Sequence, residues 1–254
     1  MPAIETSTYT WGQFVIVHWA AWAPGLSTRA EWLDWQANRR QISSQTASPT
    51  PPNVSKTLLR RLSPLAKTVL WVIADCWDDQ AVNCPAVFSS ANGEINRALG
   101  LLQDLQAEQE LSPTAFSLSV HNAIAGLFSI LHHNNQELAV LAPAAAGLGP
   151  GFIEALGMLA AGEQEVLLVF YDEVLPSWFP SAPWQLSNQF PCALALRLQA
   201  VSSKGLSLKF AVGQDQLDTG EQALQLLNLI RFLLDEQTHC LQLGSQNQSW
   251  QWQK

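Results

Sequence analysis

Short apolar runs alternate with amphipathic helical segments along the second half of this chain. The runs Leu138–Ala142 and Val166–Tyr171 contain no charged residue, which is typical of strands buried on both faces of a sheet. The segments 94–106 and 150–161 have the length and apolar spacing of helices. Strands that alternate with helices favour a parallel sheet covered on both faces. We therefore predict an α/β fold with a mostly parallel sheet.

Other elements follow from local signals. Phe14–Val17 is β-branched and aromatic, as expected of a first strand, and Pro64 opens a helix at its first turn. Cys192–Leu198 and Leu206–Val212 are predicted to pair with each other as antiparallel strands. In the helix over 94–106, we expect these side chains to face inward: Ile95, Leu99, Leu102 and Leu105.

The chain shows no composition shift that marks a second domain. We predict one domain over residues 1–244 and a separate tail over 245–254, either frayed or docked. The helix over 151–161 is apolar nearly all round and must be buried. Either the helix over 221–234 or a partner protein is expected to cover it.

Charge and composition limit the possible partners. Lys and Arg number 13 against 21 Asp and Glu, a net charge of −8, which argues against binding nucleic acid or an anionic membrane surface. Charged residues make up only 13% and there are 11 Trp, which indicates a surface partly hidden against a protein partner. The N-terminus lacks a secretory signal and residues 14–23 are too short to span a bilayer. We expect a cytoplasmic protein.

The cysteines offer little chemistry by sequence. Cys76, Cys84, Cys192 and Cys240 form no CxxC pair, so we expect no disulfide framework and no zinc site. Inert buried thiols are the simplest interpretation, although an acyltransferase that uses Cys192 or Cys84 is one alternative. Adjacent residues on a helix point in different directions, so the pair His132–His133 does not predict a metal site either. No cofactor or metal is predicted.

A glycine-rich loop suggests a second alternative. Residues 147–151 follow a strand and open a helix, as in sites that bind phosphate on backbone N–H groups. Asp172 ends the next strand, where a ribose-binding carboxylate would lie. However, the glycines are spaced GxGxG rather than GxGxxG, and Pro150 removes one donor. A dinucleotide-binding module is therefore a minor alternative.

One long motif carries a family resemblance. Residues 111–126 read LSPTAFSLSVHNAIAG, which resembles the segment of β-ketoacyl synthases at their dimer interface. The segments 21–26 and 61–67 resemble the opening of short ketosynthase-like proteins from aryl polyene gene clusters. Residues 165–172 resemble the strand after the nucleophile helix. The similarity covers about residues 14–200.

The resemblance implies roughly one half of a thiolase-like fold, the N-terminal ketosynthase-like domain. It places the family's catalytic cysteine at Ala145, within the turn 143–147. A methyl group cannot form a thioester. The histidine or asparagine partners of the family come from a C-terminal half, and no motif around His239 resembles theirs. The resemblance therefore implies a pseudoenzyme with no catalytic residue of its own.

What remains resembles a chain-length-factor-like subunit of polyketide or fatty-acid-type biosynthesis. Such subunits form a heterodimer or larger heteromer with a catalytic β-ketoacyl-ACP synthase, help shape its acyl tunnel, and so meet acyl carrier protein indirectly. By this analogy Thr114 and Ala115 leave room for the acyl chain and Phe116 acts as a floor or gate. Packing of Phe116 in this domain's own core is equally compatible with the sequence. His121 and Asn122 belong to the same interface motif, with helix capping or buried hydrogen bonding as alternatives.

Overall fold

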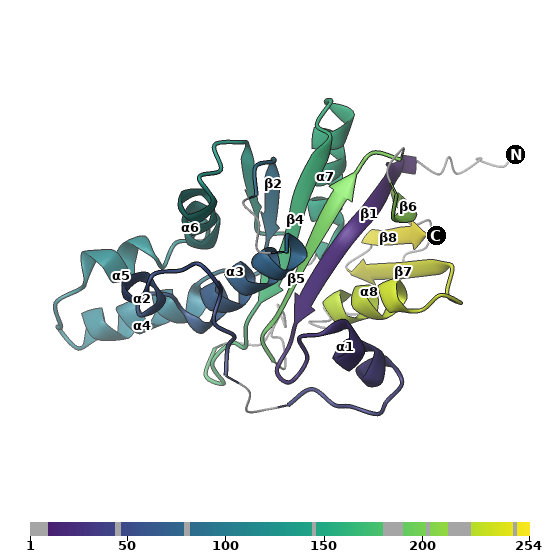
Figure 1. Cartoon of the computed structure of the whole chain (residues 1–254). Coiled ribbons are helices and arrows are strands. Elements are labelled where there is room, and N and C mark those ends of the chain that lie inside the picture. Colours follow the sequence, from purple (N-terminus) through teal and green to yellow (C-terminus); the bar gives the residue numbers. More distant parts are fainter. Residues whose placement is uncertain are drawn as a thin grey trace, which may run out of the picture.

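The computed structural model describes residues 10–43, 47–78, 82–143, 146–179, 190–201, 204–212, 225–245 and 248–254. The described strands form one eight-stranded sheet with helices on both faces (Figure 1). The strands are β1 (Thr10–Trp22), β2 (Ala86–Ser89), β3 (Leu138–Leu141), β4 (Glu165–Asp172), β5 (Cys192–Gln199), β6 (Leu206–Val212), β7 (Cys240–Ser245) and β8 (Gln248–Gln253). The helices are α1 (Arg29–Gln36), α2 (Lys56–Leu59), α3 (Pro64–Cys76), α4 (Ile95–Gln106), α5 (Pro113–Ser117), α6 (Ala123–His132), α7 (Gly149–Ala160) and α8 (Gln225–Leu234).

The sheet is mixed, with the strand order β3-β2-β4-β5-β1-β6-β8-β7. The predicted α/β class is confirmed, but the prediction of a mostly parallel sheet is wrong. Only β2 pairs in parallel, with β3 and β4, and helices separate these three strands in the chain. No helix in the described chain lies between β4 and β5 or between β7 and β8, and such direct returns give antiparallel pairs.

The predicted pairing of β5 with β6 is also wrong, because β1 lies between them. β1 pairs with β5 through Val15–Trp22 and with β6 through Thr10–Ile16, in both cases antiparallel. Consecutive residues of β1, such as Ala20 and Ala21, belong to the cores on opposite faces. A strand that is apolar on both faces belongs in the middle of a sheet, which places β1 between the other two strands.

Two apolar cores flank the sheet. Along β4, Leu168 faces the core that contains α7 and α8, whereas Val169 faces the core that contains α3 and α6. On β5, the side chains towards α3 are the small Ala193 and Ala195. They let α3 approach closely, so that the Cys76 thiol lies 3.6 Å from the carbonyl oxygen of Ala195.

The apolar helix α7 packs on this chain's own sheet through Phe152. The ring of Phe152 lies 5.6 Å from Phe14 on β1 and 5.6 Å from Phe170 on β4. It also lies 5.6 Å from Phe210 on β6 and 5.3 Å from Trp252 on β8 (centroid distances). α7 therefore packs on one face of the sheet, in the same core as α8, while Gly157 and Ala160 on α7 stay exposed.

The predicted C-terminal tail is part of this sheet. Residues 248–253 form β8, which pairs with β6 and β7, and the Trp252 side chain is fully buried. Of the two alternatives for the tail, residues 248–253 therefore show the docked one. Trp250 and Trp252 alternate with glutamines, the period of a half-buried strand.

The hairpin of α4 and α5 projects from the side of the sheet, away from β7 and β8 (Figure 1). The prediction that the leucines of α4 face inward is wrong. No residue of α4 is buried, and Leu102 and Leu105 expose 59% and 58% of their surface. The 3.6-residue period identified the helix correctly but could not show whether another element covers its apolar face.

Candidate functional site

The turn before α7 is the position at which the sequence places the family nucleophile. Ala145 itself lies outside the described residues. The described part of the turn runs from Ala146, through Gly147 with φ +62°, to the first turn of α7. This is the predicted strand-to-helix bend.

Side chains from the C-terminal part of this chain lie on the turn. The indole N–H of Trp250 donates to the carbonyl oxygen of Ala146 over 2.9 Å. A Cβ atom added to Gly149 would lie 2.1 Å from Cε2 of Trp250, and one added to Gly147 would lie 1.9 Å from Oε1 of Gln225. Gln225 is buried, and its Oε1 has no hydrogen-bond partner among the described residues. An indole and an amide are not nucleophiles, so neither replaces a catalytic thiol.

The same packing explains the glycine-rich loop. Gly147 and Gly149 face Gln225 and Trp250, and a Cβ on Gly151 would lie 2.8 Å from the ring of Phe170. The space over these glycines is filled by side chains, where a nucleotide site needs room for a pyrophosphate. The loop therefore offers a dinucleotide no access.

Asp172, the predicted ribose ligand, has another role. Its carboxylate accepts hydrogen bonds from the Ser90 hydroxyl (2.8 Å) and from the backbone N–H groups of Ala91 (3.0 Å) and Asn92 (3.1 Å). Burial raises the pKa of the Asp172 carboxyl to about 6, although these hydrogen bonds lower the pKa. Asp172 thus fixes the loop between β2 and α4.

The cysteines fit the inert interpretation better than a catalytic one. Cys76, Cys84 and Cys192 are buried, whereas Cys240 is exposed. Burial raises the pKa of Cys84 to about 12 and raises the pKa of Cys192 strongly as well. Because the thiolate is the nucleophile, neither cysteine is activated.

The hairpin α4–α5 presents the residues predicted for the tunnel and the interface. Ser112 caps α5 by accepting from the backbone N–H of Ala115 (3.3 Å). Thr114 is exposed and Ala115 is half-buried. Phe116 exposes 61% of its surface, so the alternative that it packs in this chain's own core is wrong.

His121 and Asn122 lie at the start of α6 in different surroundings. The imidazole Nε2–H of His121 donates to the carbonyl oxygen of Leu141 on β3 (3.1 Å), since a carbonyl can only accept. The same ring packs on Gly93, where a Cβ would lie 2.5 Å from its Nδ1. Asn122 is exposed, and its side chain does not cap α6. His121 therefore makes a contact within this chain, and Asn122 is available to a partner.

A shallow groove adjoins the hairpin. It has a volume of about 390 Å³, and its lining includes Leu99 and Leu102 of α4 and Trp178. Trp178 exposes 57% of its surface. Together with Leu105 and Phe116, these side chains form an exposed apolar surface along the hairpin.

Within the described ranges, no three His, Cys, Asp or Glu side chains gather closely enough to hold a metal ion. His132 instead accepts from the backbone N–H of Val82 (3.3 Å), and His133 adopts the left-handed conformation that ends α6. In the part of the chain that the structure describes, no helix is both long and apolar enough to cross a bilayer.

Residues 32–253 match the family model of the β-ketoacyl synthase N-terminal domain. The chain belongs to the β-ketoacyl synthase family. A comparison with curated protein sequences found no match. Trp250 covers the turn before α7, where the sequence resemblance places the family's nucleophile.

Solved structures share this thiolase-like fold. One is a chain from the complex of the ketosynthase ApeO with its chain length factor ApeC from Xenorhabdus doucetiae. It is 24% identical, with a TM-score of 0.81 over 96% of this chain and 100% of that chain. The ishigamide ketosynthase/chain length factor is 16% identical, with a TM-score of 0.59 over 79% of this chain and 66% of that one.

The match to a full-length ketosynthase is shorter. The ketosynthase from module 1 of the bacillaene synthase of Bacillus amyloliquefaciens is 15% identical, with a TM-score of 0.57 over 82% of this chain. This chain spans only 47% of that ketosynthase. It therefore corresponds to about half of that chain's fold.

Gln225 and Trp250 are the site residues that the sequence did not reveal. They lie 78 or more residues after the turn, in segments with no motif. The alternation of Trp250 and Trp252 with glutamines was the one signal that a buried strand ends the chain. Nothing in it indicated which surface that strand covers.

Proposed function

We propose that this protein is a non-catalytic, chain-length-factor-like subunit that pairs with a catalytic β-ketoacyl-ACP synthase. The partner would carry out decarboxylative condensation with malonyl-carrier protein, and this chain would help to shape the tunnel for the growing acyl chain. The observation that carries the proposal is the exposed apolar surface of the α4–α5 hairpin. An exposed apolar patch of this kind is typical of a protein interface.

The hairpin surface comprises Leu102, Leu105, Leu111 and Phe116, which expose between 37% and 61% of their surface. Its sequence contains the motif that resembles the ketosynthase dimer interface. β3 forms one edge of the sheet. Its last residue, Leu141, accepts a hydrogen bond from His121, which belongs to the same motif. An uncharged edge strand next to an apolar hairpin favours an extensive contact with a second protein.

The turn before α7 supports the non-catalytic part of the proposal. Trp250 and Gln225 lie where an acylated cysteine would need space. The end-to-end match with a chain from a ketosynthase and chain length factor complex is in keeping with the same role. Assembly as a heterodimer, contact with acyl carrier protein through the synthase, and a cytoplasmic location are part of this proposal.

Within the hairpin, we assign Thr114 and Ala115 to the tunnel side of the interface and Phe116 to its floor or gate. Asn122 is exposed and can hydrogen-bond across the interface. His121 supports the interface from within, because its imidazole joins the start of α6 to the end of β3. None of these residues has a catalytic role.

Co-expression with a candidate catalytic β-ketoacyl-ACP synthase, followed by size exclusion, tests the proposal. We expect a 1:1 complex with the wild-type chain and its loss with the double variant Leu102→Asp/Leu105→Asp. Leu33→Asp is the matched control, because Leu33 is also an exposed leucine (40%) but lies on α1, far from the hairpin. Equal melting temperatures of the isolated variants would show that folding is unaffected. A wild-type monomer that ignores the synthase would refute the proposal.

A further inference from the structure

A second cavity lies at a gap in the sheet, away from the α4–α5 hairpin. β6 pairs with β1 only as far as Ile16, and the register of β1 is irregular between Ile16 and His18. Among the described strands, only β5 pairs with the rest of β1. α1, α3 and α8 surround the open side and leave a cavity of about 780 Å³. This volume is in the range of small-molecule sites, roughly 300–1,000 Å³.

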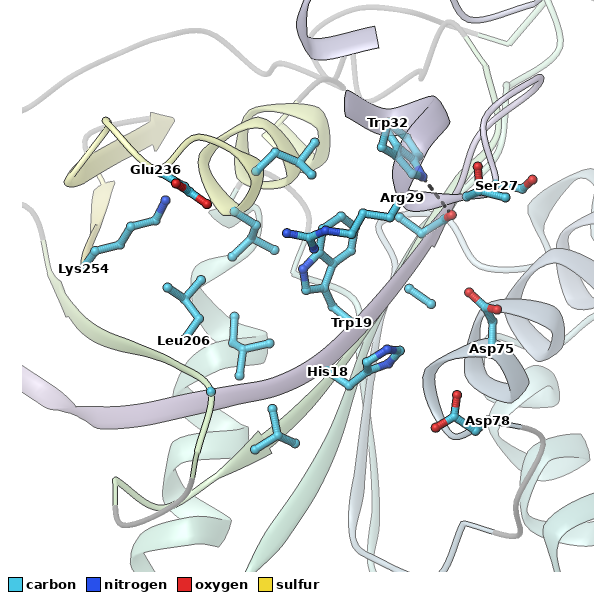
Figure 2. Close-up of a pocket in the computed structure, with 18 of the residues that line it drawn as sticks. His18, Trp19, Ser27, Arg29, Trp32, Asp75, Asp78, Leu206, Glu236 and Lys254 are labelled. Carbon is cyan, nitrogen blue, oxygen red and sulfur yellow. Dashed lines mark hydrogen bonds between the residues drawn. The ribbon is translucent and has the colours of Figure 1, made fainter. Parts of the chain in front are cut away.

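Trp19 and Arg29 lie at the centre of this cavity (Figure 2). The guanidinium carbon of Arg29 is 5.8 Å from the centroid of the Trp19 ring. Among the described residues, no carboxylate pairs with Arg29. By contrast, Arg39 and Arg40, just after the same helix, pair with Asp34 (2.7 Å) and Glu31 (2.9 Å). Arg29 thus presents an unpaired, planar cation beside an aromatic ring.

The wall beside this pair is apolar and firmly held. Leu206, Leu233 and Leu234 line one side of the cavity. On the other side, the indole N–H of Trp32 donates to the carbonyl oxygen of Ala21 over 3.0 Å, which fixes α1 against β1. The cavity therefore exists before any ligand binds, which lowers the entropic cost of binding.

The remaining charges restrict the ligand. The Lys254 ammonium donates to the carbonyl oxygens of Phe232 (2.6 Å) and Asp235, so it is already occupied. Two further carboxylates line the cavity: Asp78, just after α3, and Glu236, on the opposite side near Lys254 (Figure 2). These carboxylates would repel a phosphate or another multiply charged anion. A single carboxylate close to Arg29 suffers least from this repulsion.

We propose that this cavity binds a monocarboxylate with a flat apolar body. Its carboxylate pairs with the guanidinium of Arg29, whose planar donors match carboxylate geometry. Its apolar body lies beside Trp19 and against Leu206 and Leu233. The proposal does not depend on the pairing with a synthase, because the cavity is formed by this chain alone.

Isothermal titration of the full chain with 2-naphthoate tests the proposal. The neutral analogue 2-naphthalenemethanol has the same ring system without the charge. We expect 2-naphthoate to bind at least tenfold more tightly, a difference of about 1.4 kcal/mol. Arg29→Gln should remove this preference, whereas Arg39→Gln should keep it, since Arg39 is the exposed arginine beyond the end of the same helix.

Three results would overturn the proposal: no heat of binding at millimolar 2-naphthoate, equal affinity for the alcohol, or an unchanged affinity in Arg29→Gln. The comparison of the two ligands on the wild-type chain needs no substitution, so it holds even if a variant folds poorly. A melting curve of Arg29→Gln is a check on folding, and we expect no change because the side chain is exposed.

Discussion

Trp250 donates its indole N–H to the carbonyl oxygen of Ala146, 104 residues earlier in the chain, over 2.9 Å. This bond joins the last strand to the turn that precedes α7. The indole also lies flat against Gly149, in the place of a Cβ atom. The turn before α7 is thus packed as part of a core.

Gly149→Ala tests this packing. A Cβ atom at Gly149 would lie 2.1 Å from the Trp250 ring, so the buried indole must move. We expect the free energy of unfolding to fall by roughly 1–3 kcal/mol, as in other overpacked cores. Urea denaturation followed by circular dichroism measures the difference.

Gly157→Ala is the matched control on the same helix. It has no atom within 4 Å of the added Cβ, so we expect it to stabilise the fold by roughly 0.5–1 kcal/mol through helix propensity. Equal effects of the two substitutions would contradict the close contact between Gly149 and Trp250.

The carboxylates at the end of β4 make stability depend on pH. Burial, with a smaller contribution from the nearby charges of Glu94 and Asp172, raises the pKa of Glu173 to about 7, although hydrogen bonds from Asn96 lower it. A raised pKa means that the folded state favours the protonated form. The free energy of unfolding should therefore decrease as the pH rises from about 5 to about 8.

Glu173→Gln should reduce this loss. We expect the variant to match the wild type at pH 5 and to exceed its stability by about 1 kcal/mol at pH 8. Glu163→Gln, at an exposed carboxylate after α7, is the control and should follow the wild type at both values. Parallel stability curves for Glu173→Gln and wild type would show that Glu173 does not ionise in this pH range.

Ala115→Phe tests the role of the hairpin in the tunnel. If Ala115 leaves room for the acyl chain, a larger side chain should shorten the product of the reconstituted pair without breaking the complex. Mass spectrometry of the products measures this. Ala37→Phe, at an exposed position after α1, should leave the product length unchanged. Products of wild-type length from Ala115→Phe would remove Ala115 from the tunnel.

The cysteines can be tested by labelling with iodoacetamide under native conditions. Only Cys240 is exposed, so we expect one modified cysteine by intact-mass analysis and all four after denaturation. Incubation with an acyl thioester should leave no adduct on Cys84 or Cys192, because burial raises the pKa of both thiols. A stable acyl adduct on either residue would favour the acyltransferase alternative.

Local signals predicted individual elements well. Pro64 begins α3, as predicted, after the cap Ser63, and Thr28 caps α1 by accepting from the backbone N–H of Glu31. These signals work because capping and helix period involve residues close in the chain. Pairing of β1 between β5 and β6 involves strands about 180 residues apart, and no local pattern encodes that choice.

The sequence by itself determined most of the helices and strands, the family, and the absence of a cysteine at position 145, because these depend on residue identity and short spacing. The tertiary structure alone decided that Trp250 and Gln225 cover the turn before α7, that Leu102 and Leu105 point outward, and that Arg29 lies beside Trp19 in a cavity. The physical reason is that an apolar or charged residue gives the same sequence pattern whether or not another element covers its side chain in the fold. Only the packing of distant segments shows which surfaces are covered and which are left open to a partner or a ligand.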